Sequence, residues 1–439
     1  MRVLLKVFLK NINEYMFNFT KIHPSVILIS LLPIFFIIGS AALNVLIVII
    51  CFFFMKQFFN FNDFVHIEKF EKWKIFFLIF FIYLLISSFF AEDFFKAFKA
   101  SFSQIRFFIL LLFIIFYFNP KNNIAKFVVP IWSLILLFVC VDTNIQFITG
   151  IDVFGYPAEG YLSENRSFFN VNIGRLGGPF GDELIVGSFI SKFGSPLIFY
   201  YICIFSKLNR PQKIYSILFL ILLIETVLLS GERSSFIIIF LSFLIALILY
   251  GDFKKNIIIF IISILSISTF VNINKFSKQR YQDFIYILGN VEESSYGRIY
   301  SSSIEVFKKN FFFGTGLKNY HNNCIKLKDP NPLSRDPYCS PNHSHNFVLQ
   351  ILSETGIIGF SLFYLFIGSV IFQLSKKLKR YNRSENLEKS FINGSIYICL
   401  FYVIPSIMPA GSFFTSWNGT IFWLNLGFVM SYFNKINER

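Results

Sequence analysis

Long apolar runs, separated by short polar segments, dominate the chain. Lys74–Phe90 and Ile257–Phe270, for example, are close to continuously apolar over a length suited to crossing a bilayer. A helix of about 20 apolar residues spans the roughly 30 Å hydrocarbon core. A β-barrel would instead show short segments in which apolar and polar residues alternate. The pattern therefore predicts an all-α polytopic membrane protein.

The apolar runs predict about twelve transmembrane helices. An even number places both chain termini on the same side of the membrane. The predicted spans are 25–39, 41–58, 75–90, 104–118, 127–148, 184–206, 214–230, 234–250, 256–273, 346–372, 391–409 and 414–433.

Basic residues assign the two sides of the membrane. Lysine and arginine total 23 in the segments that this topology puts on the side of the termini, against 5 in the short opposite connections. Cytoplasmic loops carry such an excess, although long loops escape the rule. The long loop at 274–345 is therefore predicted to be extracytoplasmic, which in a Gram-negative cell means periplasmic. The chain divides into an N-terminal membrane region (1–273), this loop, and a C-terminal membrane region (346–439).

Composition supports a membrane protein and argues against a nucleic-acid partner. The chain is 55% hydrophobic and only 15% charged, and most of its net charge of +15 lies in the inner loops. Membrane lipids are the expected surroundings. Met1–Thr20 lacks the long apolar core and small-residue cleavage site of a signal peptide. It is predicted to lie as an amphipathic helix on the inner membrane surface.

The predicted outer face carries several segments with a distinct pattern. Ala91–Ser103 alternates phenylalanine with charged residues, which is typical of an amphipathic segment in the membrane interface. The loop at 274–345 shows helical spacing of apolar residues at 276–288 and 297–310. The loop is thus predicted to be partly helical.

Two of the six cysteines, Cys324 and Cys339, lie in this loop. An oxidising compartment favours disulfides between such residues. We predict a disulfide that closes a small loop just before His343, with a stabilisation of roughly 3 kcal/mol on the loop-entropy argument.

Three arginines are candidate ligands of a phosphate group. Arg233 sits in a very short outer turn, Arg298 begins a helical pattern in the long loop, and Arg175 lies in a glycine-rich run. A structural interpretation pairs Arg233 with Glu232 or a lipid phosphate, and leaves Arg298 on a solvated helix face. The functional interpretation is a clamp on a lipid-linked diphosphate, because guanidinium groups bind phosphate in bidentate geometry.

His343 and His345 are candidate catalytic residues. They could bind a metal with Cys339, or serve as a structural cap, but no carboxylate cluster or CxxC pattern accompanies them. A neutral imidazole at the membrane face can instead act as general base on a sugar hydroxyl. No Asp-x-Asp motif occurs in the outer loops. We therefore expect no metal and no cofactor, with arginines neutralising the leaving diphosphate.

Three motifs in this set resemble the O-antigen ligase and O-antigen polymerase superfamily of bacterial envelope glycosyltransferases. One is Ser230-Gly231-Glu232-Arg233, and a second runs from Arg298 through the segment from Phe312 to Tyr320. The strongest is His345-Asn346-Phe347, followed by Glu354-Thr355-Gly356-Ile357-Ile358-Gly359. The run from Arg175 to Phe180 is similar to the family's outer-loop segment.

The resemblance implies a glycan donor linked to undecaprenyl diphosphate and a metal-independent, inverting transfer at the periplasmic face. It implies that Arg233 and Arg298 hold the donor diphosphate and that His345 is the base, with His343 as an extra histidine. The leading hypothesis is a ligase that transfers O-antigen glycan to lipid A–core. The alternative is a polymerase that uses another lipid-linked repeat as acceptor.

Two other classes of function are weaker alternatives to glycosyl transfer. A lipid-linked glycan flippase or transporter would need a polar site at the membrane midplane, whereas the apolar spans carry few ionisable groups, with Glu225 as an exception. A non-catalytic assembly protein would not require the arginines and histidines.

Overall fold

The structure is a computed structural model of the whole chain. It describes residues 24–60, 72–118, 127–160, 174–251, 294–328, 343–378, 387–404 and 408–435, with short pieces at 278–279, 282–283, 286, 289–292 and 339. Within these residues every secondary-structure element is a helix. The one β-type contact among them is an isolated antiparallel bridge between Ile151 and Pro157. The predicted all-α class is confirmed.

Seven described helical segments are long and apolar enough to cross a membrane: Trp73–Phe90, Phe94–Tyr117, Val129–Thr149, Val186–Lys207, Arg210–Leu229, Arg233–Tyr250 and Phe347–Ser375. Val26–Ile38 and Ser40–Met55 are shorter apolar helices. A polytopic membrane protein is therefore confirmed, whereas the count of twelve stays a prediction. The predicted span at 256–273 and the N-terminal amphipathic helix lie outside the described residues.

Packing divides the chain into two units that both draw on distant parts of the sequence. Unit 1 contains residues 1–46, 117–285 and 384–398, and unit 2 contains residues 47–116, 286–383 and 399–439. The division into an N-terminal region, a periplasmic loop and a C-terminal region describes topology along the chain and remains a prediction.

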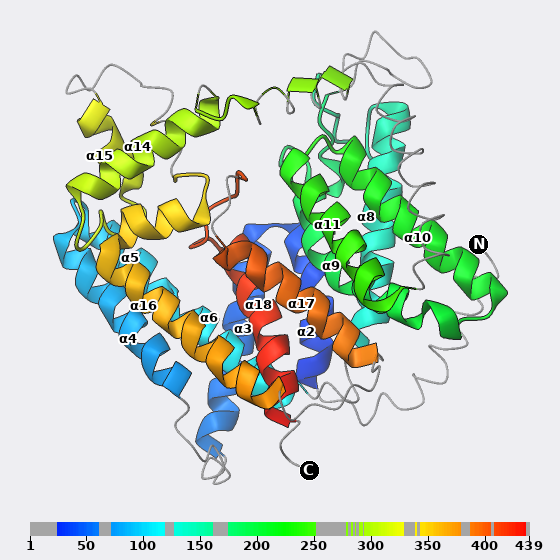
Figure 1. Cartoon of the computed structure of the whole chain (residues 1–439), viewed down its shortest axis with the longest axis horizontal. Coiled ribbons are helices and arrows are strands. Elements are labelled where there is room, and N and C mark those ends of the chain that lie inside the picture. Colours follow the sequence, from blue (N-terminus) through cyan, green and yellow to red (C-terminus); the bar gives the residue numbers. More distant parts are fainter. Residues whose placement is uncertain are drawn as a thin grey trace. The chain divides into compact units, whose positions relative to one another are not determined.

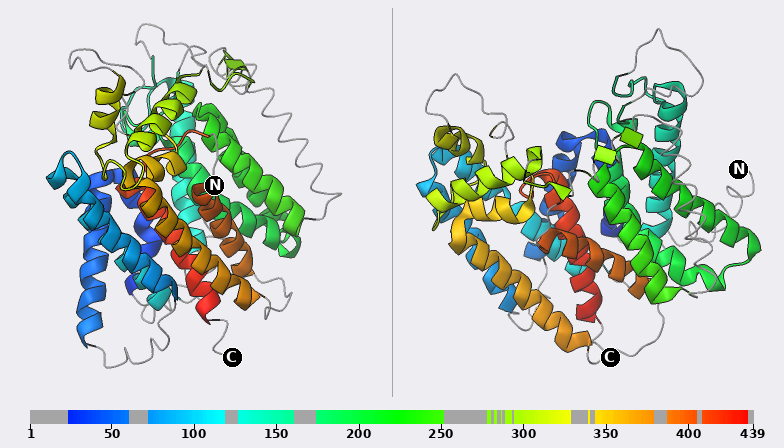
Figure 2. Two further views of the ribbon diagram at one scale, coloured as in Figure 1. Left: turned by 60° about the vertical axis from the view of Figure 1, so that its left-hand side comes forward. Right: turned by 45° about the horizontal axis from the view of Figure 1, so that its top comes forward.

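Unit 1 is built around α9. This helix is buried on nearly all sides, and α8, α10 and α11 pack against it, as the teal and green ribbons in Figure 2 show. Asn209 and Gln212 form a reciprocal capping box at the start of α10, which satisfies backbone groups that a helix start leaves open. The helices of this unit are α2 (Pro24–Ile38), α8 (Val129–Thr149), α9 (Val186–Ile204), α10 (Arg210–Leu229) and α11 (Arg233–Tyr250).

Unit 2 is built around α4 and α16, which lie side by side in Figure 1. Aromatic rings fill this interface: Phe77 contacts Phe366, and Phe80 contacts Phe363. Besides α4 (Lys72–Ser87) and α16 (Phe347–Leu378), the unit contains most of α3 (Ser40–Asn60), η3 (Ser88–Phe90), α5 (Phe94–Ser103), α6 (Ile105–Tyr117), α14 (Ser295–Lys309), α15 (Tyr320–Lys328) and α18 (Ser416–Lys435). Helix α17 (Leu387–Val403) contributes to both units.

Helix α16 is broken at Gly356, which has φ 65° and ψ −174°. Figure 1 shows its two limbs, yellow and orange, meeting at an angle. A loop from 311 to 316 supplies the backbone partners that the break would otherwise lose. The loop donates two backbone hydrogen bonds to α16, from Thr315 N–H to Ser353 O (2.9 Å) and from Gly316 N–H to Glu354 O (2.9 Å). It accepts two from α16, at Phe311 O from Ile357 N–H (2.8 Å) and at Phe312 O from Ile358 N–H (3.4 Å). The sequence predicted one continuous span at 346–372, so the break is a correction.

Glycine is required at this junction for two reasons. Gly314 and Gly356 both have positive φ, at 72° and 65°, where a Cβ atom is strained. A Cβ on Gly314 would also lie 2.5 Å from the Glu354 carbonyl, and one on Gly356 would meet the Phe312 carbonyl. The Glu-Thr-Gly-Ile-Ile-Gly motif therefore has a structural role, because it lets two backbone segments approach closely.

The predicted amphipathic segment forms α5. Asp93 caps its start by accepting the backbone N–H of Lys96 at 2.9 Å. Ala97 and Ser101 are buried, while Phe95 is 82% exposed. Helix α14 likewise realises the helical pattern at 297–310, so a partly helical loop is confirmed; the pattern at 276–288 lies mostly outside the described residues.

Candidate functional site

In unit 1, the turn between α10 and α11 is held by the carboxylate of Glu232. Its oxygens accept the backbone N–H groups of Gly187 (2.7 Å) and Ser188 (3.1 Å), in the first turn of α9, and the hydroxyl of Ser235 (3.0 Å). These N–H groups have no partner within their own helix, and a helix start favours negative charge. Glu232 thus fixes the neighbouring Arg233, the half-buried first residue of α11, to the start of α9.

Arg175 shares this electrostatic environment. Burial raises the pKa of Glu232, and the positive charge of Arg175 opposes that rise most strongly. One guanidinium nitrogen of Arg175 donates to the Leu184 carbonyl at 2.8 Å, while its Nε is buried and has no hydrogen-bond partner in the described part of the chain. Arg175 therefore acts on the carboxylate of Glu232 through its charge, and Arg233 is the next residue along the chain.

In unit 2, the two histidines lie just before α16. Their ring centroids are 4.3 Å apart, and His345 has the left-handed value φ 50°, uncommon for a residue other than glycine. The His345 carbonyl accepts the backbone N–H of Ala410 at 2.7 Å, which ties the turn to the segment before α18. His343 Nε2 is buried without a hydrogen-bond partner among the described residues.

Both imidazoles have a lowered pKa, which favours the neutral form. The pKa of His343 is lowered to about 3, mainly by burial and further by the nearby His345 and Lys318. A hydrogen bond with the Ala410 backbone acts in the opposite direction and raises it. Burial also lowers the pKa of His345. A neutral imidazole can accept a proton, as a general base must.

Helix α14 contacts the histidine turn through two tyrosines one helical turn apart. Tyr296 lies edge-on to the His345 ring, with centroids 5.9 Å apart. The Tyr300 hydroxyl is hydrogen bonded to the Asn346 side chain. Asn346 Oδ1 in turn accepts the backbone N–H groups of Val348 (3.0 Å) and Leu349 (3.1 Å) and so caps α16. The residue after the predicted base is thus a helix cap held by α14.

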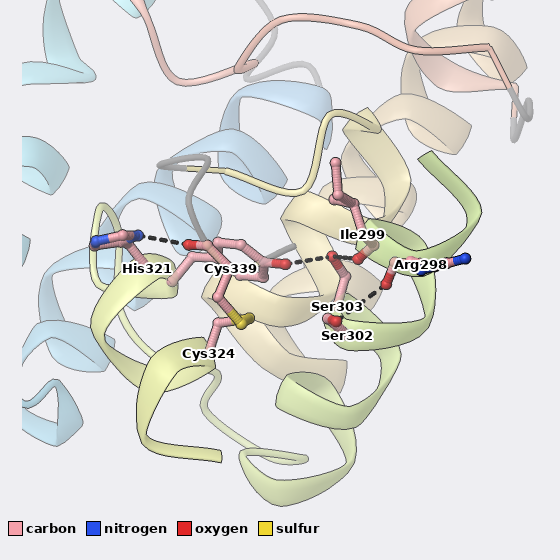
Figure 3. Close-up of a disulfide and its surroundings, with 8 residues drawn as sticks. Arg298, Ile299, Ser302, Ser303, His321, Cys324 and Cys339 are labelled. Carbon is pink, nitrogen blue, oxygen red and sulfur yellow. Dashed lines mark hydrogen bonds between the residues drawn. A yellow bond between two sulfur atoms is a disulfide. The ribbon is translucent and has the colours of Figure 1, made fainter. Parts of the chain in front are cut away.

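Arg298 lies between these tyrosines in sequence but is exposed. Figure 3 shows its side chain pointing away from the disulfide. That disulfide joins Cys324 to Cys339, with Cα atoms 5.4 Å apart, which confirms the predicted pairing. Because the sulfur of Cys339 is bonded to Cys324, it is not a thiolate that could bind a metal beside the histidines.

The predicted site residues fall into two groups. Arg175 and Arg233 belong to unit 1, whereas Arg298, His343 and His345 belong to unit 2. A clamp that uses Arg233 together with Arg298 draws on both units, and it stays a prediction.

Three charged residues near these groups were given no role of their own by the sequence reasoning. Lys318 acts on His343, Lys192 is buried within α9, and Glu354 is buried at the break in α16. Lys192 and Glu354 therefore join Glu225 as ionisable residues within predicted spans, which corrects the expectation from the sequence. Both are visible in the sequence as charges inside apolar runs, a signal that by default indicates function. Nothing in the sequence connects Lys318 with His343.

Residues 218–364 match the O-antigen ligase family model. This segment of the chain is similar to the O-antigen ligase family. The matched segment, about a third of the chain, contains Arg233, Arg298, His343, His345 and the break in α16. No curated protein matches the chain.

The match confirms the resemblance to the O-antigen ligase and polymerase superfamily. It connects the chain with glycosyltransferase-type chemistry on lipid-linked glycans in a multi-pass membrane protein. Arg175 and Lys192 lie N-terminal to the matched residues.

Proposed function

We propose that this protein is an O-antigen ligase, which transfers O-antigen glycan from undecaprenyl diphosphate to lipid A–core at the periplasmic face of the bacterial inner membrane. The observation that carries the proposal is the half-buried histidine pair before α16, with ring centroids 4.3 Å apart, within the segment that matches the family. A base that works on a sugar hydroxyl must have a proton-free nitrogen, and burial keeps one available.

In the proposed reaction, His345 takes the proton of an acceptor hydroxyl. The oxygen attacks the anomeric carbon of the donor sugar from the face opposite the diphosphate, so the configuration inverts. The bond to the diphosphate breaks, and the electron pair leaves with that group. Arg175, Arg233 and Arg298 neutralise the negative charge that develops there. His343 orients its neighbour or serves as the base itself.

Reconstitution tests this assignment. Purified full-length protein is mixed with lipid-linked donor and lipid A–core, in the presence of a chelator, and transfer is followed by gel mobility of the glycolipid. We expect His345→Ala and Arg233→Ala to lose transfer while remaining folded. His321→Ala is a matched control, because His321 bonds the Cys339 carbonyl through Nδ1 in the same unit. Normal turnover by His345→Ala would refute its role as base.

The runner-up function is a polymerase, with a second lipid-linked repeat as the acceptor. A gene deletion separates the two. Loss of a ligase leaves bare core and long lipid-linked polymer, whereas loss of a polymerase leaves core that carries a single repeat. An unchanged polysaccharide profile would contradict both functions.

A further inference from the structure

The amide of Gln350 is a buried link between α16 and the segment before α18. Only 1% of this residue is exposed, and it lies one helical turn after Asn346, the cap of α16. Its Nε2 donates to Ser412 Oγ at 2.7 Å, and its Oε1 accepts the backbone N–H of Phe413 at 2.8 Å. One side chain therefore holds two successive residues of that segment.

A buried carboxylate fixes the orientation of this amide. Gln350 Nε2 also donates to Glu354 Oε1 at 3.1 Å, one turn further along α16. Glu354 Oε2 accepts the backbone N–H of Lys318 at 3.3 Å, which ties the carboxylate to the chain just after the 311–316 loop. Exchange of the two amide ends would place the NH2 group against the Phe413 N–H and the oxygen against the carboxylate. The bonded orientation is therefore strongly favoured.

The segment that Gln350 holds contacts the histidine turn at Ala410. The Ala410 N–H donates to the His345 carbonyl at 2.7 Å. Burial lowers the pKa of both His343 and His345, and a hydrogen bond with the Ala410 backbone opposes that fall in each ring. A bond that favours the protonated ring needs an acceptor, so the backbone group is the carbonyl. It keeps a proton on the ring nitrogen that it contacts and leaves the other nitrogen with its lone pair.

We propose that Gln350 is a positioning residue for the base. Through Ser412 and Phe413 it fixes the neighbouring Ala410. Ala410 in turn orients the His345 imidazole, so that one nitrogen is free to take a proton. The inference rests on the proposed function for the source of that proton, the acceptor hydroxyl, and it extends that function by naming the groups that orient the base.

The competing explanation is that Gln350 only satisfies buried polar groups and stabilises the fold. The chain offers a matched control in Gln146, a fully buried glutamine of α8. Its amide also bonds two backbone groups, the Tyr156 carbonyl at 3.1 Å and the Gly178 N–H at 2.8 Å. Gln146→Met and Gln350→Met therefore remove similar bonds, but only Gln350 belongs to the unit that contains the two histidines.

The experiment measures the chemical reactivity of the histidines, so it does not depend on glycan transfer. Full-length protein in nanodiscs is treated with diethyl pyrocarbonate, which modifies neutral imidazoles. Mass spectrometry with peptide fragmentation gives the modification rate of His345. His321, whose Nδ1 is bonded to the Cys339 carbonyl in the same unit, is the internal reference. Melting temperatures record the stability of each variant.

We expect Gln350→Met to raise the modification rate of His345 relative to His321 by at least about threefold, because a turn that loses its anchor opens more often. Gln350→Asn, a milder change whose amide is too short to reach both partners, should show a smaller rise. Gln146→Met should lower the melting temperature and leave the ratio unchanged. The exchange Gln350→Glu/Glu354→Gln keeps a donor and an acceptor at the pair and should restore the wild-type ratio.

An unchanged ratio in Gln350→Met and Gln350→Asn, or an equal rise in Gln146→Met, would overturn the inference. Transfer kinetics separate this outcome from failure of the proposed function. If His345 is the base, Gln350→Met lowers kcat with little change in KM for the donor, and it adds no further loss to His345→Ala. A raised modification rate with normal kcat would confirm that Gln350 orients the histidine and would refute only the role of His345 as base.

Discussion

The turn at Glu232 in unit 1 and the break in α16 in unit 2 hold the candidate site residues in place by different means. In unit 1 a single carboxylate bonds to the start of a neighbouring helix and positions the arginine beside it. In unit 2 backbone groups of one segment bond to backbone groups of another, and glycines permit the contact. Unit 1 should therefore be sensitive to side-chain charge, and unit 2 to any added Cβ atom.

The largest effect is expected from Gly356→Ala. The new methyl group would meet the Phe312 carbonyl and would force a positive φ on alanine. We expect a loss of about 3 kcal/mol or more, or failure to accumulate in the membrane. Thermal unfolding in detergent measures the loss. Gly368→Ala in the same helix is the control, because nothing lies within 4 Å of the position that its Cβ atom would take. Equal melting temperatures for the two variants would contradict the structural role of the break.

Glu232→Ala comes next, with an expected loss of about 2–3 kcal/mol. Removal of the carboxylate leaves the Gly187 and Ser188 N–H groups without an acceptor, and an unsatisfied buried group costs about 1–3 kcal/mol. Glu232→Gln keeps one acceptor oxygen and should lose less. Glu183→Ala, an exposed acid in the same unit, should melt like wild type. A Glu232→Gln variant less stable than Glu232→Ala would contradict the proposed anchoring.

Removal of the disulfide should have a comparable or smaller effect that stays within the loop of unit 2. The bond joins residues separated by 15 positions, for which the loop-entropy argument predicts roughly 3 kcal/mol. We expect Cys324→Ser/Cys339→Ser to be cut faster by trypsin between α14 and α16. A lower melting temperature of the entire protein, with no change in the rate of trypsin cleavage between α14 and α16, would show that the bond does not act locally.

The smallest effect concerns pH and His343. Its pKa falls to about 3 in the folded protein from an ordinary value of 6.5, so only the unfolded form takes up the proton between these values. The free energy of unfolding is therefore unaffected by this group above pH 6.5. Below pH 6.5 it decreases by at most about 1.4 kcal/mol per pH unit. Between pH 7.5 and 5, the melting temperature of wild type should fall more steeply on acidification than that of His343→Gln. Parallel curves would show that the histidine is not held neutral.

Individual residues show which structural features could be predicted from the sequence and which could not. Apolar runs predicted nearly all described helices, and His345 with Asn346 marked the segment that matches the family. The break in α16 was missed because an apolar run through Gly356 has the same pattern as a straight span. Tyr300 was missed because its relation to Asn346 depends on how α14 packs beside α16.

The sequence by itself determined the helical membrane architecture, since burial in lipid demands long apolar helices whatever their arrangement. It also indicated the arginines and histidines proposed to carry the chemistry. Only the tertiary structure decided that Glu232 bonds to the start of α9, that Lys192 is buried, and that a loop completes the broken helix. These features depend on contacts between residues far apart in the chain, and local pattern contains no information about which distant backbone groups will meet.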